Sequence, residues 1–361
     1  MLSSSSKDGE HKSDGRELNR DKPPKAMILG VSGIALTDAE KKFFAYSNPL
    51  GFILFQRNCV NPQQTKNLIK ELRDAVGRPH APILIDQEGG RVARLKPPHW
   101  PEFPPARMIG KMAEQSLDFG LEAAKINSQL IGIELAELGI SVNCAPLADV
   151  LFNITDNAIG DRAYSSDVAI VSECARAAAE GLLWAGVLPV IKHIPGHGRT
   201  VVDPHHTQSV VKASTQELRD IDFAPFRALR DMPLGMTCHI IFEQFDKLPC
   251  SLSPVMHEII RKEIGFDGLL MSDDLNMKGV FGRIEDLVIN CLKAGSDIAL
   301  HCNGNMSEMV LVSGACPAMT EQAMDRWDRA QLRLGTPPMF VDKGGLLDRL
   351  DMLLGVAAIT S

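Results

Sequence analysis

Short apolar runs alternate with longer amphipathic stretches along most of the chain, beginning at Ala26. The runs are almost continuously apolar, which is typical of strands that are buried on both faces in a parallel sheet. Eight such runs occur, at residues 26–33, 50–55, 82–87, 141–146, 188–194, 234–240, 268–274 and 296–302.

Stretches of helical length separate these runs, and the clearest span 65–76, 117–138, 167–185 and 214–229. Ser214 with Glu217 has the pattern of a capping box at the start of the last one. Eight strands that alternate with helices, from residue 26 to about 336, predict an α/β protein with a single (β/α)8 TIM-type barrel. A doubly wound open sheet is the alternative, although no GxGxxG follows the first run, as a dinucleotide-binding sheet would require.

Composition narrows the classes of partner. The 361 residues are 45% hydrophobic, enough for a sizeable core, and the formal net charge of -7 argues against nucleic-acid binding. No apolar run reaches about 18 residues, so we expect no membrane span. The eight cysteines form no CxxC pair, and we interpret them as reduced core residues rather than disulfides or zinc ligands.

Residues 1–24 differ from the rest because they are charged and contain almost no apolar side chains. We expect a disordered extension here, followed by one catalytic domain over residues 25–361. The segment lacks the apolar core of a secretory signal and carries too many acids for a transit peptide. We therefore expect a cytoplasmic protein.

Titratable side chains stand at the ends of several predicted strands. Active sites of these barrels lie at the carboxyl ends of the strands. A single polar residue at such an end can simply mark where the strand reaches water. Titratable side chains at several strand ends, however, predict an enzyme. The strand-end groups are Arg57-Asn58, Asp86-Gln87-Glu88, Lys192-His193, His239 and Ser272-Asp273-Asp274.

The segment "KHIPGHGRTVVDPHH" (192–206) holds four of the ten histidines. Pro204 restricts Asp203 to an extended conformation, in which Asp203 and His205 point to the same side. An aspartate beside a histidine favours the imidazolium and makes a proton donor near neutral pH. From spacing alone, a solvated surface pair is an equal alternative.

The pair Asp273-Asp274 ends the seventh run. Two consecutive side chains at a strand end must diverge, so one of them can face the barrel mouth as a nucleophile or metal ligand. The other reading is a helix N-cap, which we assign to Asp274 or Asn276 because the next helix is expected to start nearby.

Four segments resemble the signature segments of glycoside hydrolase family 3, and more narrowly the single-domain bacterial β-N-acetylglucosaminidases of cell-wall recycling. The likeness runs from about Met27 to about residue 305, and the spacing "GHG", six residues, "H" is a specific part of it. The segments are "LIDQEGGRVARL" (84–95), "AIGDRAYSSD" (158–167), "KHIPGHGRTVVDPHH" (192–206) and "GFDGLLMSDDLNMKGV" (265–280).

The resemblance implies a function and a role for each site residue. Asp273 would be the nucleophile and His205 the general acid/base, held by Asp203. The enzyme would be a retaining exo-glycosidase that removes terminal GlcNAc from peptidoglycan fragments, GlcNAc-1,6-anhydroMurNAc with or without peptide. It would need no cofactor or metal and act as a monomer. Residues matching the sugar-binding positions are Asp86, Arg94, Arg162, Lys192 and His193.

One departure from the family pattern is Pro204, where relatives commonly have a small polar residue, and His206 is additional. A β-glucosidase-type member of the family, a sugar-binding barrel without catalysis, and phosphate in place of water as the acceptor stay open as alternatives. A metal-dependent barrel hydrolase is a further one. Its ligands would come from His193, His197, His205, His206, Asp86 and Asp273.

Overall fold

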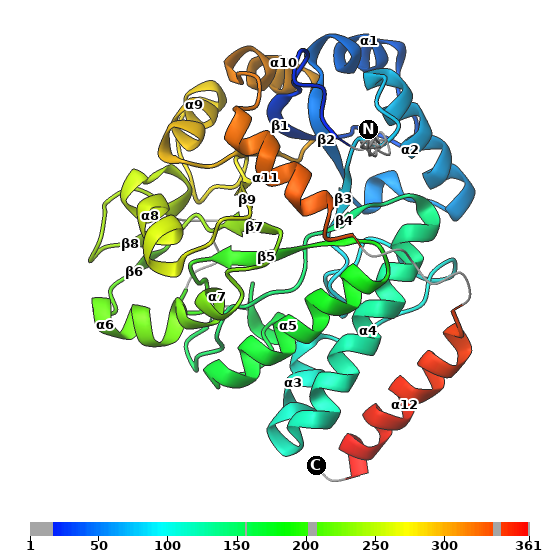
Figure 1. Cartoon of the computed structure of the whole chain (residues 1–361), viewed down its shortest axis with the longest axis vertical. Coiled ribbons are helices and arrows are strands. Elements are labelled where there is room, and N and C mark those ends of the chain that lie inside the picture. The colour runs from blue at the N-terminus through cyan, green and yellow to red at the C-terminus, as the bar shows by residue number, and fades with distance from the viewer. Residues whose placement is uncertain (1–16, 156, 201–207, 335–340, 360–361) are drawn as a thin grey trace, which may run out of the picture.

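The computed structural model describes residues 17–155, 157–200, 208–334 and 341–359. Eight parallel strands close into a barrel in the order β1-β10-β9-β7-β5-β4-β3-β2, with helices around it (Figure 1). The predicted (β/α)8 barrel is confirmed, and the open sheet is wrong because β1 pairs with both β2 and β10. The barrel strands are β1 (Lys25–Gly30), β2 (Pro49–Leu54), β3 (Ile83–Ile85), β4 (Val142–Asn143), β5 (Leu188–Ile194), β7 (Leu234–Thr237), β9 (Leu269–Asp274) and β10 (Ile298–His301).

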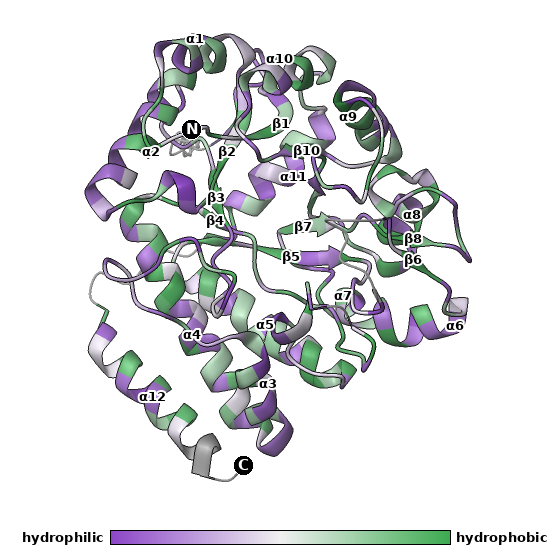
Figure 2. Cartoon of the chain, turned by 180° about the vertical axis from the view of Figure 1, so that it is seen from behind, coloured by the Kyte–Doolittle hydropathy of each residue, from purple (hydrophilic) through white to green (hydrophobic). Residues whose placement is uncertain are grey.

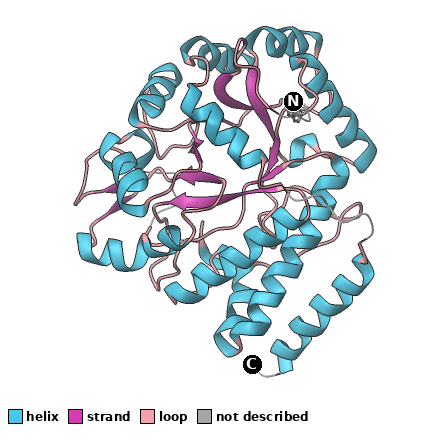
Figure 3. Cartoon of the chain, in the orientation of Figure 1, coloured by secondary structure: helices cyan, strands magenta, loops and turns pink. Residues whose placement is uncertain are grey.

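Every barrel strand falls on one of the eight apolar runs, because a strand enclosed by helices must be apolar on both faces. Figure 3 shows the strands in the middle of the molecule and helices on the outside. Most of the strands are green in Figure 2, whereas the end of β5 is purple, where Lys192 and His193 lie. That change of colour marks the end of the barrel where polar side chains gather.

Several helices begin at residues whose side chains cap them. Thr37 with Glu40 and Ser214 with Glu217 form capping boxes, the second as predicted, and Asn61 caps α2 ahead of Pro62. The helices are α1 (Asp38–Ser47), α2 (Pro62–Val76), α3 (Ala106–Gln115), α4 (Leu117–Leu138), α5 (Val168–Trp184), α6 (Thr215–Glu217), α7 (Ala224–Ala228), α8 (Pro254–Glu258), α9 (Ile284–Ala294), α10 (Met306–Ala315), α11 (Glu321–Gln331) and α12 (Lys343–Ile359).

A second, two-stranded parallel sheet joins β6 (Val210–Val211) to β8 (Ile241–Phe242) outside the barrel. The sequence did not predict it. Each strand has only two residues, too few to show a periodic pattern. The sheet places residue 210, which follows the long segment after β5, beside the chain that leaves β7.

Both ends of the described chain pack against the barrel. Leu18 is buried, its N–H donates to Asp328 of α11, and Arg20 pairs with Asp328 and Asp325. The predicted disordered extension therefore does not include residues 17–24, which are ordered against the barrel. Residues 1–16 lie outside the described part of the chain. At the other end, α12 lies along α4, where Arg349 pairs with Glu122 (Figure 1).

A helix that crosses a bilayer needs about 20 mostly apolar residues. Within residues 17–155, 157–200, 208–334 and 341–359, no helix is both long enough and apolar enough to cross a membrane.

Candidate active site

A cavity of about 540 Å³ opens at the carboxyl ends of the barrel strands. Apolar side chains such as Phe55, Met236 and Leu300 form part of its wall, and charged side chains form the rest. Asp203 and His205 lie outside the described residues. The structure brings the other six predicted site residues together in this cavity: Asp86, Arg94, Arg162, Lys192, His193 and Asp273.

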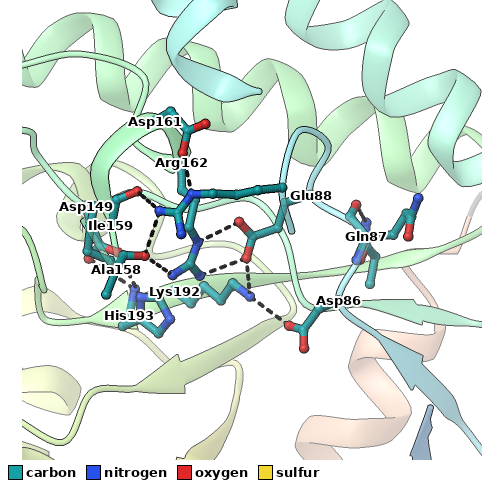
Figure 4. A network of polar contacts seen from close by, with 12 residues as sticks. Asp86, Gln87, Glu88, Asp149, Ala158, Ile159, Asp161, Arg162, Lys192 and His193 are labelled. Atoms are coloured by element: carbon teal, nitrogen blue, oxygen red, sulfur yellow. Dashed lines mark hydrogen bonds and ion pairs between the residues drawn. The ribbon is translucent and has the colours of Figure 1, made fainter. Parts of the chain in front are cut away.

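Five charged side chains of the wall form one ion-pair network, and Figure 4 shows Asp86, Glu88, Arg162 and Lys192 of it. Lys192 Nζ lies 2.9 Å from Asp86 Oδ1 and 2.7 Å from Glu88 Oε1. Arg162 binds Glu88 through two contacts of 2.9 Å, and Arg94 Nη2 lies 3.0 Å from Asp86 Oδ2. Three cations therefore share two carboxylates, and paired contacts of this kind fix the direction of each side chain.

Electrostatics keep this network ionised. Burial by itself would raise the pKa of Asp86, but the charges of Lys192 and Arg94 outweigh it and hold that pKa well below its usual range. Arg162 and Lys192 likewise outweigh burial at Glu88 and lower its pKa to about 2. Burial opposes the charge on Lys192, yet Asp86 and Glu88 raise its pKa. The network thus presents fixed charges to the cavity.

Lys192 and His193 are consecutive, yet both line the cavity. Successive side chains of a regular strand point to opposite faces. Here the pairing of β5 with β7 shifts register between Lys192 and Ile194, an irregularity that re-aims side chains. The backbone of β5 is therefore irregular at the two neighbouring residues that reach one site.

His193 is held by Asp149, a buried residue of the segment that follows β4. The Asp149 carboxylate lies 2.8 Å from His193 Nδ1 and accepts the backbone N–H groups of His193 at 3.2 Å and His197 at 2.7 Å. Burial opposes ionisation of this carboxyl, but His193 lowers its pKa. The ring of His197 lies 5.2 Å from that of His193.

Asp273 is the last residue but one of β9 and lines the same cavity. Burial by itself would raise the pKa of Asp273, but the charges of His193 and His239 bring it below its ordinary value. A carboxylate that stays ionised inside a cavity can act as a nucleophile or stabilise a developing positive charge. The predicted location of Asp273 at the barrel mouth agrees with the structure.

The N-cap assigned to Asp274 or Asn276 is wrong. Helix α9 begins only at Ile284, with Arg283 at its N-cap position. Asp274 Oδ1 instead accepts the N–H groups of Asn276 and Cys302, each at 3.1 Å, and so joins the ends of β9 and β10. Burial and the neighbouring charge of Asp273 raise the pKa of Asp274 to about 6.

Arg91 braces one edge of the cavity. Its guanidinium donates to Asp161 at 2.7 Å and to the carbonyls of Ala158 and Ile159 at 3.2 and 3.1 Å. Arg162 donates to the same Ala158 carbonyl at 2.8 Å. Two arginines thus fold the loop before residue 162 against the site (Figure 4).

Sequence reasoning did not single out Glu88 and Asp149, which hold predicted residues in place. Glu88 was visible as part of the polar cluster after the third strand, and its spacing from Asp86 placed both on one side of an extended chain. Asp149 carried no comparable signal, because its partner His193 is 44 positions away. The pairing of β4 and the chain after it with β5 brings the two together in the folded protein.

The geometry also bears on the metal-dependent alternative. Among the described residues, no group of three or more His, Cys, Asp or Glu side chains could hold a metal ion. Asp86, a ligand in that alternative, is bound to Lys192 and Arg94, and His193 is bound to Asp149. His205 and His206 lie outside the described residues.

Comparisons with known proteins agree with this architecture. A family model described as the glycosyl hydrolase family 3 N terminal domain matches residues 25–335. The beta-hexosaminidase of Chromobacterium violaceum is 32% identical over 312 residues, which cover 85% of this chain and 87% of that relative.

Two solved structures are similar over most of the chain. NagZ from Neisseria gonorrhoeae, in complex with N-trifluoroacetyl-D-glucosamine, matches with a TM-score of 0.81 and 27% identity, over 93% of this chain and 98% of that one. A glycoside hydrolase family 3 beta-N-acetylglucosaminidase from Paenibacillus sp. matches with a TM-score of 0.77 and 28% identity, over 91% of this chain and 67% of that one.

Proposed function

This chain belongs to glycosyl hydrolase family 3, and on that premise we propose that it is a retaining exo-β-N-acetylglucosaminidase. The observation that carries the proposal is that Asp273, with its lowered pKa, shares a cavity with a wall of ion-paired cations and carboxylates. The matched relatives named for β-hexosaminidase or β-N-acetylglucosaminidase activity support the choice of sugar.

The proposed first step is attack of Asp273 on the anomeric carbon. The glycosidic C–O bond breaks, and His205 gives its proton to the leaving oxygen. In the second step His205 takes a proton from water, which displaces Asp273 and releases the sugar with its configuration retained. Asp203 would orient His205 and favour its imidazolium form. The assignment of His205 and Asp203 rests on the sequence.

The proposed sugar-binding groups are Asp86, Arg94, Arg162, Lys192 and His193. Asp86 accepts hydrogen bonds from sugar hydroxyls, while the cations donate to hydroxyl and acetamido oxygens. The ion pairs hold these groups in place before the sugar arrives, which lowers the entropy lost on binding. A cavity of about 540 Å³ suits one N-acetylated pyranose, in keeping with exo action.

For the natural substrate we propose peptidoglycan fragments, GlcNAc-1,6-anhydroMurNAc with or without peptide, processed in the cytoplasm by a monomeric enzyme. Residues 25–361 would act as one catalytic unit. The support is the likeness of the four signature segments to recycling enzymes of this family.

The experiment that tests the function compares 4-nitrophenyl β-GlcNAc with the β-glucoside, with and without phosphate. We expect cleavage of the GlcNAc substrate, a β-configured first product by ¹H NMR, and no dependence on phosphate. Preference for the glucoside would assign the β-glucosidase alternative. An α-configured product would exclude the retaining mechanism, and dependence on phosphate would identify a phosphorylase.

A further inference from the structure

Asp149 is a buried carboxylate beside the cavity, and three polar groups contact it. Leu147 pairs with Lys192, and the Ala148 N–H donates to the Lys192 carbonyl at 2.8 Å, so the chain after β4 runs alongside β5. This pairing brings Asp149, of which 1% is exposed, against His193. Backbone pairing therefore fixes where Asp149 stands relative to His193.

The carboxylate of Asp149 contacts several groups of the segment from His193 to His197. Oδ1 accepts the N–H groups of His193 and His197, and Oδ2 lies 2.8 Å from His193 Nδ1. Within this segment the Gly196 N–H donates to the His193 carbonyl at 2.7 Å, and Gly196 has a φ of +143°. Asp149 thus fixes both the turn after β5 and the ring that lines the cavity.

We propose that Asp149 is a positioning residue that holds the proton of His193 on Nδ1 and presents Nε2 to the sugar. This inference rests on the proposed function, in which His193 binds the substrate. A carboxylate oxygen accepts hydrogen bonds and has no proton to donate, so Nδ1 must carry the proton. The ring lines the cavity, so Nε2 is the nitrogen that meets a ligand.

The surroundings of the pair agree with an ionised Asp149. His193, His197 and Arg162 all interact electrostatically with its carboxylate, as does Asp222, a buried acid of the chain after α6. Burial opposes ionisation of Asp149, but its hydrogen bonds and electrostatic interactions with His193 and His197 outweigh burial and lower its pKa. A protonated Asp149, which could donate to Nδ1 and reverse the tautomer, is thereby disfavoured.

The first test measures the tautomer and needs no substrate. Histidine side-chain ¹⁵N NMR at neutral pH should show Nδ1 of His193 protonated, with the signal assigned by its loss in His193→Gln. In Asp149→Asn the amide can keep accepting the backbone N–H groups while its NH2 donates to Nδ1, so the proton should move to Nε2. A wild-type spectrum with Nδ1 unprotonated would overturn the proposal, whether or not the variant folds.

The second test is a double-mutant cycle on kcat/KM with 4-nitrophenyl β-GlcNAc. Asp149→Asn should lower kcat/KM roughly ten- to hundredfold, the equivalent of one hydrogen bond to a charged group. If Asp149 acts through His193, adding Asp149→Asn to His193→Gln should cause little further loss. Additive losses would show that Asp149 supports the fold in general, and would overturn the proposal.

Asp297→Asn is the matched control. Asp297 is also a buried carboxylate, bound to Arg261 and Arg326 at 2.7 and 2.8 Å, but it stands before β10, at the end of the barrel opposite the cavity. The control should lower the melting temperature and leave the His193 tautomer unchanged. Failure of the proposed function would appear separately, as a wild-type enzyme with the Nδ1 tautomer and no activity on the GlcNAc substrate.

Discussion

The backbone N–H of Asp274 donates to Oδ1 of Asp273 across 2.8 Å. This contact stabilises the ionised form of Asp273, whereas Asp274 feels the charge of Asp273 as repulsion. Two adjacent carboxyls of one strand therefore differ, with the pKa of one lowered and that of the other raised to about 6. Their roles should differ in the same way.

Replacement of Asp273 by alanine should remove the nucleophile and lower kcat at least about a thousandfold, or about 4 kcal/mol in activation free energy. Asp274→Asn retains the N–H that binds Asp273 and should stay measurably active. A 5-fluoro glycosyl donor followed by peptide mass spectrometry should label Asp273. Label on Asp274, or near-full activity of Asp273→Ala, would assign a different nucleophile or assistance by the acetamido group.

The proposed acid/base pair makes its own prediction. His205→Ala should slow substrates with poor leaving groups most, because a good leaving group needs little protonation. Asp203→Asn should move the alkaline limb of the kcat profile to lower pH, since it removes the charge that stabilises imidazolium. A series of aryl β-GlcNAc substrates measures both effects, and His206→Ala is the control that should show neither. The opposite assignment of His205 and His206 would follow if only His206→Ala showed leaving-group dependence.

Glu88→Gln should destabilise the protein. It leaves Lys192 and Arg162 side by side with a single negative partner, and breaking a buried ion pair costs roughly 3–5 kcal/mol. Glu258→Gln removes one half of an exposed pair with Lys262, which water and salt screen, and should change the free energy of unfolding much less. Urea unfolding at pH 7 compares the two, and equal losses would refute a special contribution of the network.

The same glutamate should shape the dependence of stability on pH. The pKa of Glu88 is about 2 in the folded protein, below its ordinary 4.5, so the ionised form is favoured by folding. Its contribution is present above about pH 4.5 and is lost as the pH falls toward 2. The free energy of unfolding should therefore fall less steeply between pH 4.5 and pH 3 in Glu88→Gln than in the wild type. Parallel curves would contradict the pKa shift.

Removal of residues 341–361 should lower stability and spare catalysis. Helix α12 lies beyond the residues matched by the family model, but it buries Leu350 and Leu353 and pairs Arg349 with Glu122. Loss of each buried leucine contributes about 1.5–3 kcal/mol. The shortened protein should melt at lower temperature with an unchanged kcat on 4-nitrophenyl β-GlcNAc. A large fall in kcat would show that α12 takes part in shaping the site.

The barrel was predictable because its strands are buried on both faces and therefore consist of almost continuously apolar residues. The pair β6 and β8 was not, since two residues are too few for any periodicity to appear. The N-cap at Asp274 failed for another reason. Local propensity favours aspartate as a cap, but the Cys302 N–H, from a distant strand, engages its carboxylate.

The residues of the candidate site likewise divide into those that the sequence predicted and those that it did not. Asp86 and Asp273 end apolar runs, so the sequence alone places them at the barrel mouth. The irregularity in β5 at Lys192 and His193 leaves no mark in the pattern of polar and apolar residues, and for these two the family resemblance was the better guide. Asp149 was missed because its importance depends on a contact that exists only in the folded chain.

The chain that leads into β1 has a practical consequence for handling the enzyme. Leu18 and Arg20 are bound to α11, and β1 begins at Lys25, so Glu17 emerges at the end of the barrel opposite the cavity. A linker joined at Glu17 would tether the protein to a bead or electrode with its mouth toward the solution. Immobilised this way, it should keep its access to large, soluble glycans.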